Sequence, residues 1–73
     1  MTNTKLLTDI IKEKGIKKGK IIEILGISYK KLRDKINNKD EFTASEIQVL
    51  CDILGIKSKT LRDKIFFVIN VGK

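Results

Sequence analysis

The sequence predicts an all-α fold made of five short helices. Apolar residues recur at intervals of three and four positions over nearly the whole chain, as one buried face of a helix requires. Proline is absent, so it interrupts no helix interior. Glycine, serine and threonine stand between the periodic stretches, where helices end or begin. With 73 residues, the chain is predicted to be a single domain, residues 1–73, with a minimal core.

The first two predicted helices each end at a glycine. The first covers about residues 4–14, where leucine and isoleucine pairs share one face, and it stops at Gly15. The second is short, lies around residues 21–25, and stops at Gly26. Glycine can take the left-handed conformation of a helix C-cap without a steric penalty.

Ser28 predicts the start of a third helix, over residues 29–36, because its side-chain oxygen can accept from the free amides of the first turn. Residues 18–37 then contain a helix, a glycine turn, a serine cap and a second helix, which is the helix-turn-helix arrangement. In that arrangement the second helix enters the major groove of DNA and the first lies across the backbone. If Leu32 and Ile36 face the core, the outer face of the third helix is long, polar and mostly cationic.

The fourth helix has the clearest start signal in the chain. Thr43 is followed three residues later by Glu46, which is the spacing of a capping box, and Gly55 ends the helix. Ser58 can cap a fifth helix. The C-terminal helix and tail are predicted at about residues 59–71, and the apolar end of this segment could instead be extended.

The charge composition favours a polyanion as partner. The chain has 16 Lys plus Arg against 9 Asp plus Glu and a formal charge of +7. A first basic block, residues 12–20, and a second, residues 28–39, each carry five cations against one carboxylate. Residues 40–56 carry four carboxylates and no cation. A coat that only keeps the protein soluble is the alternative, but such a coat mixes its signs more evenly, so nucleic acid is favoured.

The same composition argues against an enzyme. Histidine is absent, which removes the imidazole general base and the imidazole metal ligand. Cys51 alone cannot build a zinc site and is expected to be a small apolar residue of the core. We therefore expect no metal and no cofactor. No apolar run approaches the roughly 18 residues of a membrane span, and the first residues do not resemble a signal peptide, so a cytoplasmic location is expected.

Several short motifs stand in a characteristic order. They are ILGISY at residues 24–29, Leu32 followed by INNK at 36–39, EFT at 41–43 and ILGI at 53–56. Over about residues 6–67 the chain thus resembles the lambda-repressor-like, Cro-type helix-turn-helix family of temperate bacteriophages and mobile elements. The resemblance implies a five-helix lambda-repressor-like DNA-binding fold. It also implies a transcription regulator of the repressor or Cro-like kind that binds operator sites in double-stranded DNA, often as a homodimer, in the cytoplasm of a bacterial host.

The resemblance also assigns roles to residues of this chain. The residues that it implies for base contact lie in and just before the third helix: Ser28, Tyr29, Lys30 and Arg33. The residues expected at phosphates flank the two helices or lie between the base readers: Lys17, Lys18, Lys31, Asn38 and Lys39. The family usually has Ser or Thr as the cap of the second helix, whereas Lys17 and Lys18 stand there with Gly19 in the first turn. This departure predicts that the second helix starts late or frays.

Two of the outer side chains have alternative roles. Asp34 could accept from cytosine N4, or it could pair with Lys30 one turn earlier on the helix. Tyr29 could contact a thymine methyl group or a phosphate, or it could cover the edge of the core. Arg33 can bind the O6 and N7 atoms of guanine in a bidentate pair, and Lys30 can reach the same acceptors or a phosphate.

The chain also contains an internal repeat. Residues 24–36, ILGISYKKLRDKI, and residues 53–65, ILGIKSKTLRDKI, match at ten of thirteen positions, so the chain offers two candidate helix-turn-helix units. The helix before the second turn lies in the acidic stretch, where carboxylates would repel the phosphate backbone, so the first unit is favoured. Arg33 and Arg62 occupy equivalent positions of the two copies, and neither is expected on the apolar face.

The predicted function is that of a sequence-specific DNA-binding transcription regulator that occupies an operator through the helix 29–36. The alternative is a modulator that acts mainly by binding a partner repressor protein, with the apolar tail, residues 66–71, as its docking surface. A general RNA binder is disfavoured, because the chain has only one Tyr and three Phe to stack on bases.

Overall fold

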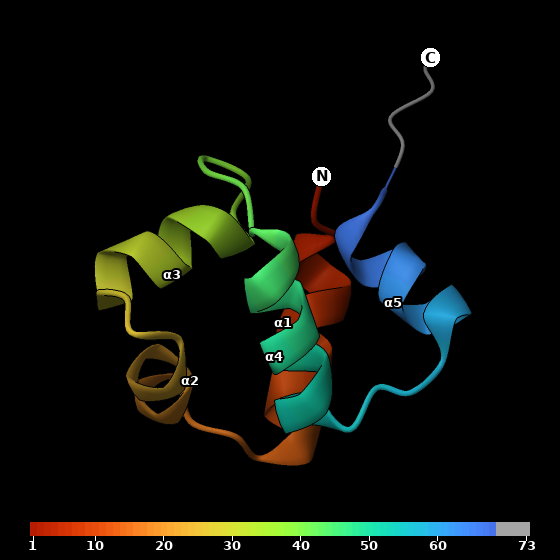
Figure 1. Cartoon of the computed structure of the whole chain (residues 1–73), viewed down its shortest axis with the longest axis horizontal. Coiled ribbons are helices and arrows are strands. Elements are labelled where there is room, and N and C mark those ends of the chain that lie inside the picture. Colours follow the sequence, from red (N-terminus) through yellow and green to blue (C-terminus); the bar gives the residue numbers. More distant parts are fainter. Residues whose placement is uncertain (69–73) are drawn as a thin grey trace.

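Five helices make up the protein, which is described here over residues 1–68 of a computed structural model. They are α1 Thr4–Lys14, α2 Lys18–Leu25, α3 Tyr29–Ile36, α4 Ala44–Leu54 and α5 Lys59–Phe66. Helices α1 and α4 lie at the centre, α2 and α3 lie on one side of them, and α5 lies on the other (Figure 1). Helix α1 packs against α3, α4 and α5. The fold is all-α as predicted, and none of the five helices is long and apolar enough to cross a membrane.

The predicted capping signals are used at most helix ends. Gly26 has φ +68°, in the left-handed region that favours glycine, and its N–H donates to the Ile22 carbonyl at 2.8 Å. The Ser28 hydroxyl oxygen accepts from the Lys31 N–H at 3.1 Å. At the start of α4, Thr43 and Glu46 form the predicted capping box, with each side chain accepting from the other residue's N–H. The predicted bounds of the first and third helices, 4–14 and 29–36, are confirmed.

Helix α2 begins earlier than the sequence predicts. It starts at Lys18, although the Lys17 side chain makes no capping hydrogen bond, so the expectation of a late start is wrong. The N–H groups of Lys20 and Ile21 donate to the Lys17 carbonyl at 3.0 and 3.3 Å. Tertiary packing compensates for the missing cap, because the side chain of Ile21 is fully buried and that of Ile22 packs against the core.

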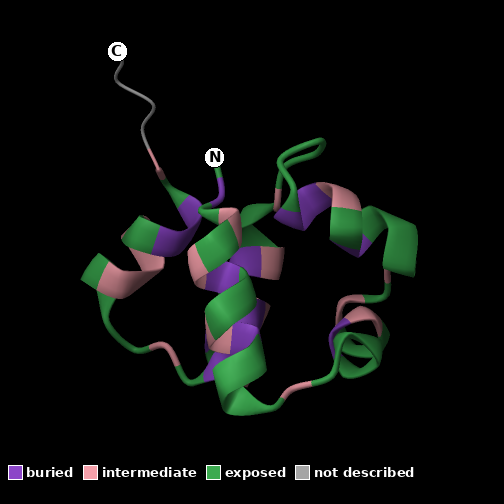
Figure 2. Cartoon of the chain, turned by 180° about the vertical axis from the view of Figure 1, so that it is seen from behind, coloured by how far each residue is buried: buried purple, intermediate pink, exposed green. Residues whose placement is uncertain are grey.

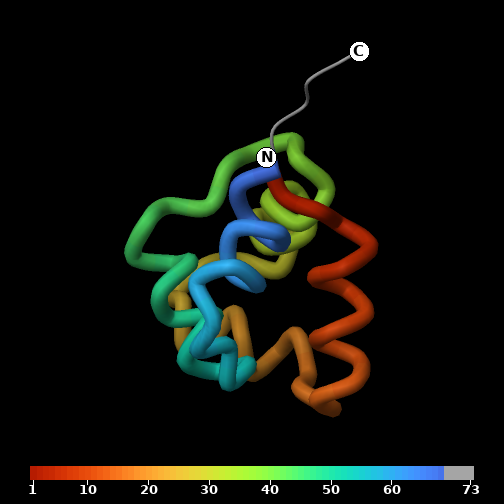
Figure 3. Tube along the Cα trace, turned by 90° about the vertical axis from the view of Figure 1, so that its right-hand side faces the viewer, coloured from red at the N-terminus to blue at the C-terminus, as the bar shows by residue number. Residues whose placement is uncertain are grey.

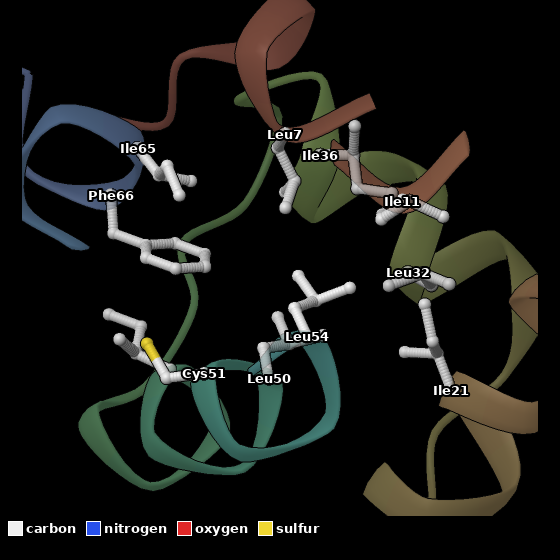
Figure 4. Close-up of a cluster of buried hydrophobic side chains, with 11 residues drawn as sticks. Leu7, Ile11, Ile21, Leu32, Ile36, Leu50, Cys51, Leu54, Ile65 and Phe66 are labelled. Atoms are coloured by element: carbon white, nitrogen blue, oxygen red, sulfur yellow. The ribbon is translucent and has the colours of Figure 1, made fainter. Parts of the chain in front are cut away.

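Side chains from all five helices meet in one core (Figure 4). Cys51 belongs to it, as predicted, and burial raises the pKa of its thiol, an effect that Asp52 reinforces and Arg62 opposes. The Phe66 ring meets the Phe42 ring edge to face, with 5.6 Å between ring centroids. The buried apolar residues are Leu7, Ile11, Ile21, Leu32, Ile36, Ile47, Leu50, Cys51, Leu54, Ile65 and Phe66.

The beginning of the chain lies beside the end of α5 (Figure 3). The Asn3 N–H donates to the Ile65 carbonyl at 2.6 Å, and the Val68 N–H donates to the Met1 carbonyl at 2.9 Å. Over the described part of the predicted C-terminal segment, residues 59–68, the helix ends at Phe66, and residues 69–71 of that prediction lie outside the described residues. After Phe66, the Val68 N–H donates to the Met1 carbonyl and not to a carbonyl of α5, so the helix does not continue there.

Candidate nucleic-acid interface

Helices α2 and α3 form a packed pair joined by a tight turn. The turn runs from Gly26 to Ser28, and the N–H groups of Gly26 and Ile27 both donate to the Ile22 carbonyl. Leu32 and Ile36 are buried and hold α3 against the core (Figure 4). The opposite face of α3 is left open to solvent, and its first turn is exposed (Figure 2). An exposed second helix after such a turn is the geometry that enters a major groove.

The four residues expected at bases are all exposed. The Ser28 oxygen caps α3 by accepting from the Lys31 N–H, but its hydroxyl hydrogen can still be donated to a ligand. Tyr29 is the first residue of α3 and is 50% exposed, outside the buried core. Arg33 lies one turn further along on the exposed side of the helix. The exposed face thus presents hydroxyl, aromatic and cationic groups together.

Lys30 and Asp34 form an ion pair along α3. Lys30 Nζ donates to Asp34 Oδ2 at 3.0 Å, and this hydrogen bond lowers the pKa of the Asp34 carboxyl below its usual value, against a smaller opposing effect of desolvation. Of the two alternatives for Asp34, the structure contains the pair with Lys30. The Lys30 side chain is nevertheless 76% exposed and remains accessible from the groove side.

The lysines expected at phosphates lie around this helix pair. Lys17 and Lys18 are exposed at the start of α2, where the absence of a side-chain cap leaves backbone N–H groups available to an anion. Lys31 is exposed on α3, and Lys39 is exposed in the following loop. In the sequence, Lys17 and Lys18 precede α3 and Lys39 follows it, so positive charges stand on both sides of the helix that carries the open face.

Asn38 is already bonded within the chain. Its Oδ1 accepts from the Thr2 N–H at 2.7 Å, and its Nδ2 donates to the Thr2 carbonyl at 2.8 Å. Its backbone N–H donates to the Lys35 carbonyl at 3.3 Å, and its φ of +65° is left-handed. A phosphate contact by Asn38 stays a prediction, and it requires one of these donors to change or share its partner.

Lys35, a cation of the second basic block, residues 28–39, is buried in the structure. Its side chain is 7% exposed, and Nζ donates to the Glu41 carbonyl and to Glu46 Oε1, both at 2.9 Å. The block therefore exposes one cation fewer than its sequence contains. The spacing carried a signal for this, because Lys35 lies three positions after Leu32 and beside Ile36, at the edge of the inward face.

The second copy of the repeat has a different geometry. Ser58 caps α5 three residues after Gly55, whereas Ser28 caps α3 two residues after Gly26, so the second connection is one residue longer. Helix α5 packs mainly on α1, while α3 packs on its preceding helix α2. These differences agree with the preference for the first copy as the helix-turn-helix.

Arg62, the counterpart of Arg33, also differs from expectation. Its side chain is half-buried, and its guanidinium lies over the Phe67 ring, 5.8 Å from the ring centroid. Its Nε atom is enclosed and has no hydrogen-bond partner among the described residues. The expectation that Arg62 stays clear of the apolar surface is therefore wrong, because this side of α5 turns partly inward, toward Phe67 and toward Cys51 of α4.

Comparison with known proteins assigns the family. No curated protein and no solved structure has a significant match to this chain. A family model described as a Cro/C1-type HTH DNA-binding domain matches residues 6–63, which include α2, the glycine turn and α3. The resemblance seen in the short motifs is thereby confirmed. The chain belongs to the Cro/C1-type helix-turn-helix family and is a DNA-binding regulator with a lambda-repressor-like fold.

Proposed function

We propose that this protein is a sequence-specific transcription regulator that occupies an operator with α3 in the major groove. The observation that carries the proposal is the open face of α3, where Ser28, Tyr29, Lys30 and Arg33 are exposed together. Cations precede this face at Lys17 and Lys18 and continue through Lys31 to Lys39. Base edges in the groove and phosphates at its rims are the ligands that such a surface suits.

Each exposed side chain of α3 has a defined role in this proposal. Arg33 reads guanine through its O6 and N7 atoms, and Lys30, oriented by Asp34, reaches the same acceptors or a phosphate. Ser28 donates its hydroxyl hydrogen to a base acceptor, and Tyr29 contacts a thymine methyl group. These contacts provide sequence discrimination.

The flanking groups provide affinity. Lys17, Lys18, Lys31 and Lys39 neutralise phosphates, and the uncapped N–H groups of α2 add fixed partial charge at the backbone. Asn38 contributes a phosphate contact only by sharing a donor that now bonds Thr2 or Thr4.

The biological setting follows from the lambda-repressor-like motifs. We assign the protein to the repressor or Cro-like regulators of a phage or mobile element, acting in the cytoplasm of a bacterial host. It binds its operator as a homodimer, so the operator is expected to be a palindrome with half-sites about one helical turn apart.

Selection of binding sites from a random duplex pool tests this function. A palindromic consensus is the expected result, and the absence of enrichment would contradict operator binding. Affinity for the selected duplex is also expected to fall with salt between about 50 and 200 mM, with a log–log slope of roughly −4 to −5 per subunit for about four to six phosphates neutralised by each subunit. A flat salt response would contradict nucleic-acid binding of any kind.

A second candidate function is favoured by one observation. Phe67 and Met1 are 51% and 55% exposed and lie beside each other near the end of α5. They offer an apolar surface to a partner repressor protein, whereas Phe66 is buried in the core. Co-elution with the repressor of the same element, lost in a Phe67→Ser variant that still binds DNA, would support this candidate.

A further inference from the structure

The end of α3 is tied to the start of α4 by one buried lysine. Lys35 Nζ donates to the Glu41 carbonyl and to Glu46 Oε1, both at 2.9 Å, and lies 3.9 Å from Asp40 Oδ2. The ammonium also lies 6.0 Å from the centroid of the Phe42 ring. All of these partners belong to the loop after α3 or to the first turn of α4.

Glu46 connects this lysine to the cap of α4. The same Oε1 atom accepts from Lys35 Nζ and from the Thr43 N–H, each at 2.9 Å. Burial alone would raise the pKa of Glu46, but the hydrogen bonds from Lys35 and Thr43 outweigh it and lower the pKa. The charged carboxylate of Glu46 therefore accepts both hydrogen bonds. One oxygen atom thus links Lys35 of α3 to the N-cap of α4.

The internal repeat provides a comparison for Lys35. Lys64 occupies the same position in the second LRDKI motif and is exposed, whereas Lys35 is nearly inaccessible. Identical local sequence thus leads to opposite surroundings. The four carboxylates of residues 40–56 explain the difference, because two of them, at Asp40 and Glu46, lie beside Lys35.

We propose that Lys35 is a positioning residue, which sets the orientation of α3 in the major groove without touching DNA. This inference rests on the proposed function. Base readout needs side chains held to within about 0.5 Å and 10–20° of their productive geometry. Lys35 lies near the end of α3 that is remote from Tyr29. Its ion pair with Glu46 holds that end of the helix against α4, so Lys35 can fix the orientation of α3 without contacting DNA. If Lys35 positions α3, its replacement should reduce discrimination between base sequences. If Lys35 instead contacted a phosphate, its replacement should reduce the salt dependence of binding.

The test compares Lys35→Met with Lys31→Met and Lys64→Met. Each variant is titrated, at several salt concentrations, with two duplexes of about 20 base pairs: the consensus selected by the wild type and a random sequence. For Lys35→Met we expect affinity for the consensus to fall about tenfold or more, with random-duplex affinity and the salt slope unchanged. Lys31→Met should lower the magnitude of the salt slope by about 0.9 per bound subunit for both duplexes. Lys64→Met should change neither property.

Two further variants separate positioning from folding. Ile65→Val removes one methylene from a fully buried side chain of α5, so it lowers the melting temperature while leaving the ratio of the two affinities unchanged. Glu46→Gln breaks the ion pair from the other side and keeps an oxygen for the Thr43 N–H. It should reproduce the loss of discrimination, and it decides the question if Lys35→Met does not fold.

Several outcomes would overturn the inference. One is a salt slope of Lys35→Met that falls as that of Lys31→Met does, which would make Lys35 a phosphate contact. Another is an unchanged affinity ratio in Lys35→Met or, where that variant does not fold, in Glu46→Gln. Failure of the wild type itself to bind either duplex would instead contradict the proposed function, so the two failures are distinguishable.

Discussion

Arg33 and Arg62 share the motif LRDKI but differ in what surrounds them. Arg33 is exposed on α3, on the face that we assign to DNA. Arg62 is half-buried, ion-paired with Asp63 at 3.5 Å and placed over the Phe67 ring. One arginine is therefore available to a ligand, and the other takes part in packing between α5 and the residues after it.

Arg33→Ala is expected to weaken binding to the selected duplex by about 1–3 kcal/mol and to relax the sequence preference, because a bidentate base contact is lost. Its melting temperature should stay near that of the wild type. Arg62→Ala should do the reverse, with a lower melting temperature and unchanged DNA affinity. Fluorescence anisotropy with labelled duplex and thermal circular dichroism measure the two effects. A larger binding loss in Arg62→Ala would transfer the reading role to the second copy.

Asn38 combines a left-handed backbone with a side chain that pairs with Thr2. Asn38→Gly is expected to lower the free energy of unfolding by about 1–3 kcal/mol, because both hydrogen bonds to Thr2 are lost. Asn38→Ala should lower it by about 1 kcal/mol more, since alanine tolerates a positive φ less well than glycine. Urea unfolding provides the measurement, and exposed Asn37 with φ −93° provides the control as Asn37→Ala. Equal effects of Asn38→Ala and Asn37→Ala would refute the role of the amide.

Among the helices, α4 has an N-terminus that depends on ionisation. Glu46 closes the capping box and pairs with Lys35, and its pKa lies below the ordinary value near 4.5. A carboxyl with a lowered folded-state pKa stabilises the protein above its unfolded-state pKa. That contribution disappears as the pH falls through the lowered folded-state pKa, so α4 is stabilised by this residue at neutral pH but not in acid.

We therefore expect the difference in free energy of unfolding between the wild type and Glu46→Gln to shrink as the pH falls below about 4.5. Urea unfolding at a series of pH values from about 7 to about 3 measures this difference. Glu23→Gln, at an exposed position of α2, is the control and should show a small difference throughout. If the difference in free energy of unfolding between the wild type and Glu46→Gln stayed constant over the pH series, the hydrogen bonds from Lys35 and Thr43 would not stabilise the charged carboxylate.

Taken as one molecule, the fold is closed along one edge of the core by the first residues of the chain together with helix α5. Helix α5 contributes Ile65 and Phe66, and the first residues bond to it through the Asn3 N–H and the Met1 carbonyl. Asn38 joins the same N-terminal segment to the loop after α3. The side of the fold away from α2 thus contributes to the support of α3 (Figure 1).

Truncation after Lys64 is expected to unfold the protein. It removes the buried side chains of Ile65 and Phe66, each of which contributes about 1.5–3 kcal/mol, from a domain whose total stability is of the order of 5 kcal/mol. Truncation after Val68 is the matched control and keeps every contact described here, so it should retain the helicity of the full chain. Circular dichroism and melting curves compare the two. A shorter variant with full-length helicity and melting temperature would mean that α5 is dispensable for folding.

The elements whose signals are local could be predicted from the amino-acid sequence alone. The spacing of leucine and isoleucine, the glycine C-caps, the Ser28 cap and the box formed by Thr43 and Glu46 all act within a few residues, so the bounds of α1, α3 and α4 could be predicted from them. The exposed candidates on α3 were predictable for the same reason, because Leu32 and Ile36 define which face remains open. The family resemblance rested on the same short motifs.

Contacts between segments that are far apart in the chain could not be predicted from the sequence, because they depend on how the helices pack. Lys35 and Lys64 have the same sequence neighbours, yet carboxylates brought in by α4 and its loop enclose the first and leave the second exposed. Arg62 is partly enclosed because it lies beside Cys51 of α4 and over the Phe67 ring, and α2 starts without a cap because Ile21 is buried. The physical reason is common to these cases. Burial and ion pairing depend on contacts between residues far apart in sequence, and such tertiary contacts override the local preferences that a sequence pattern reports.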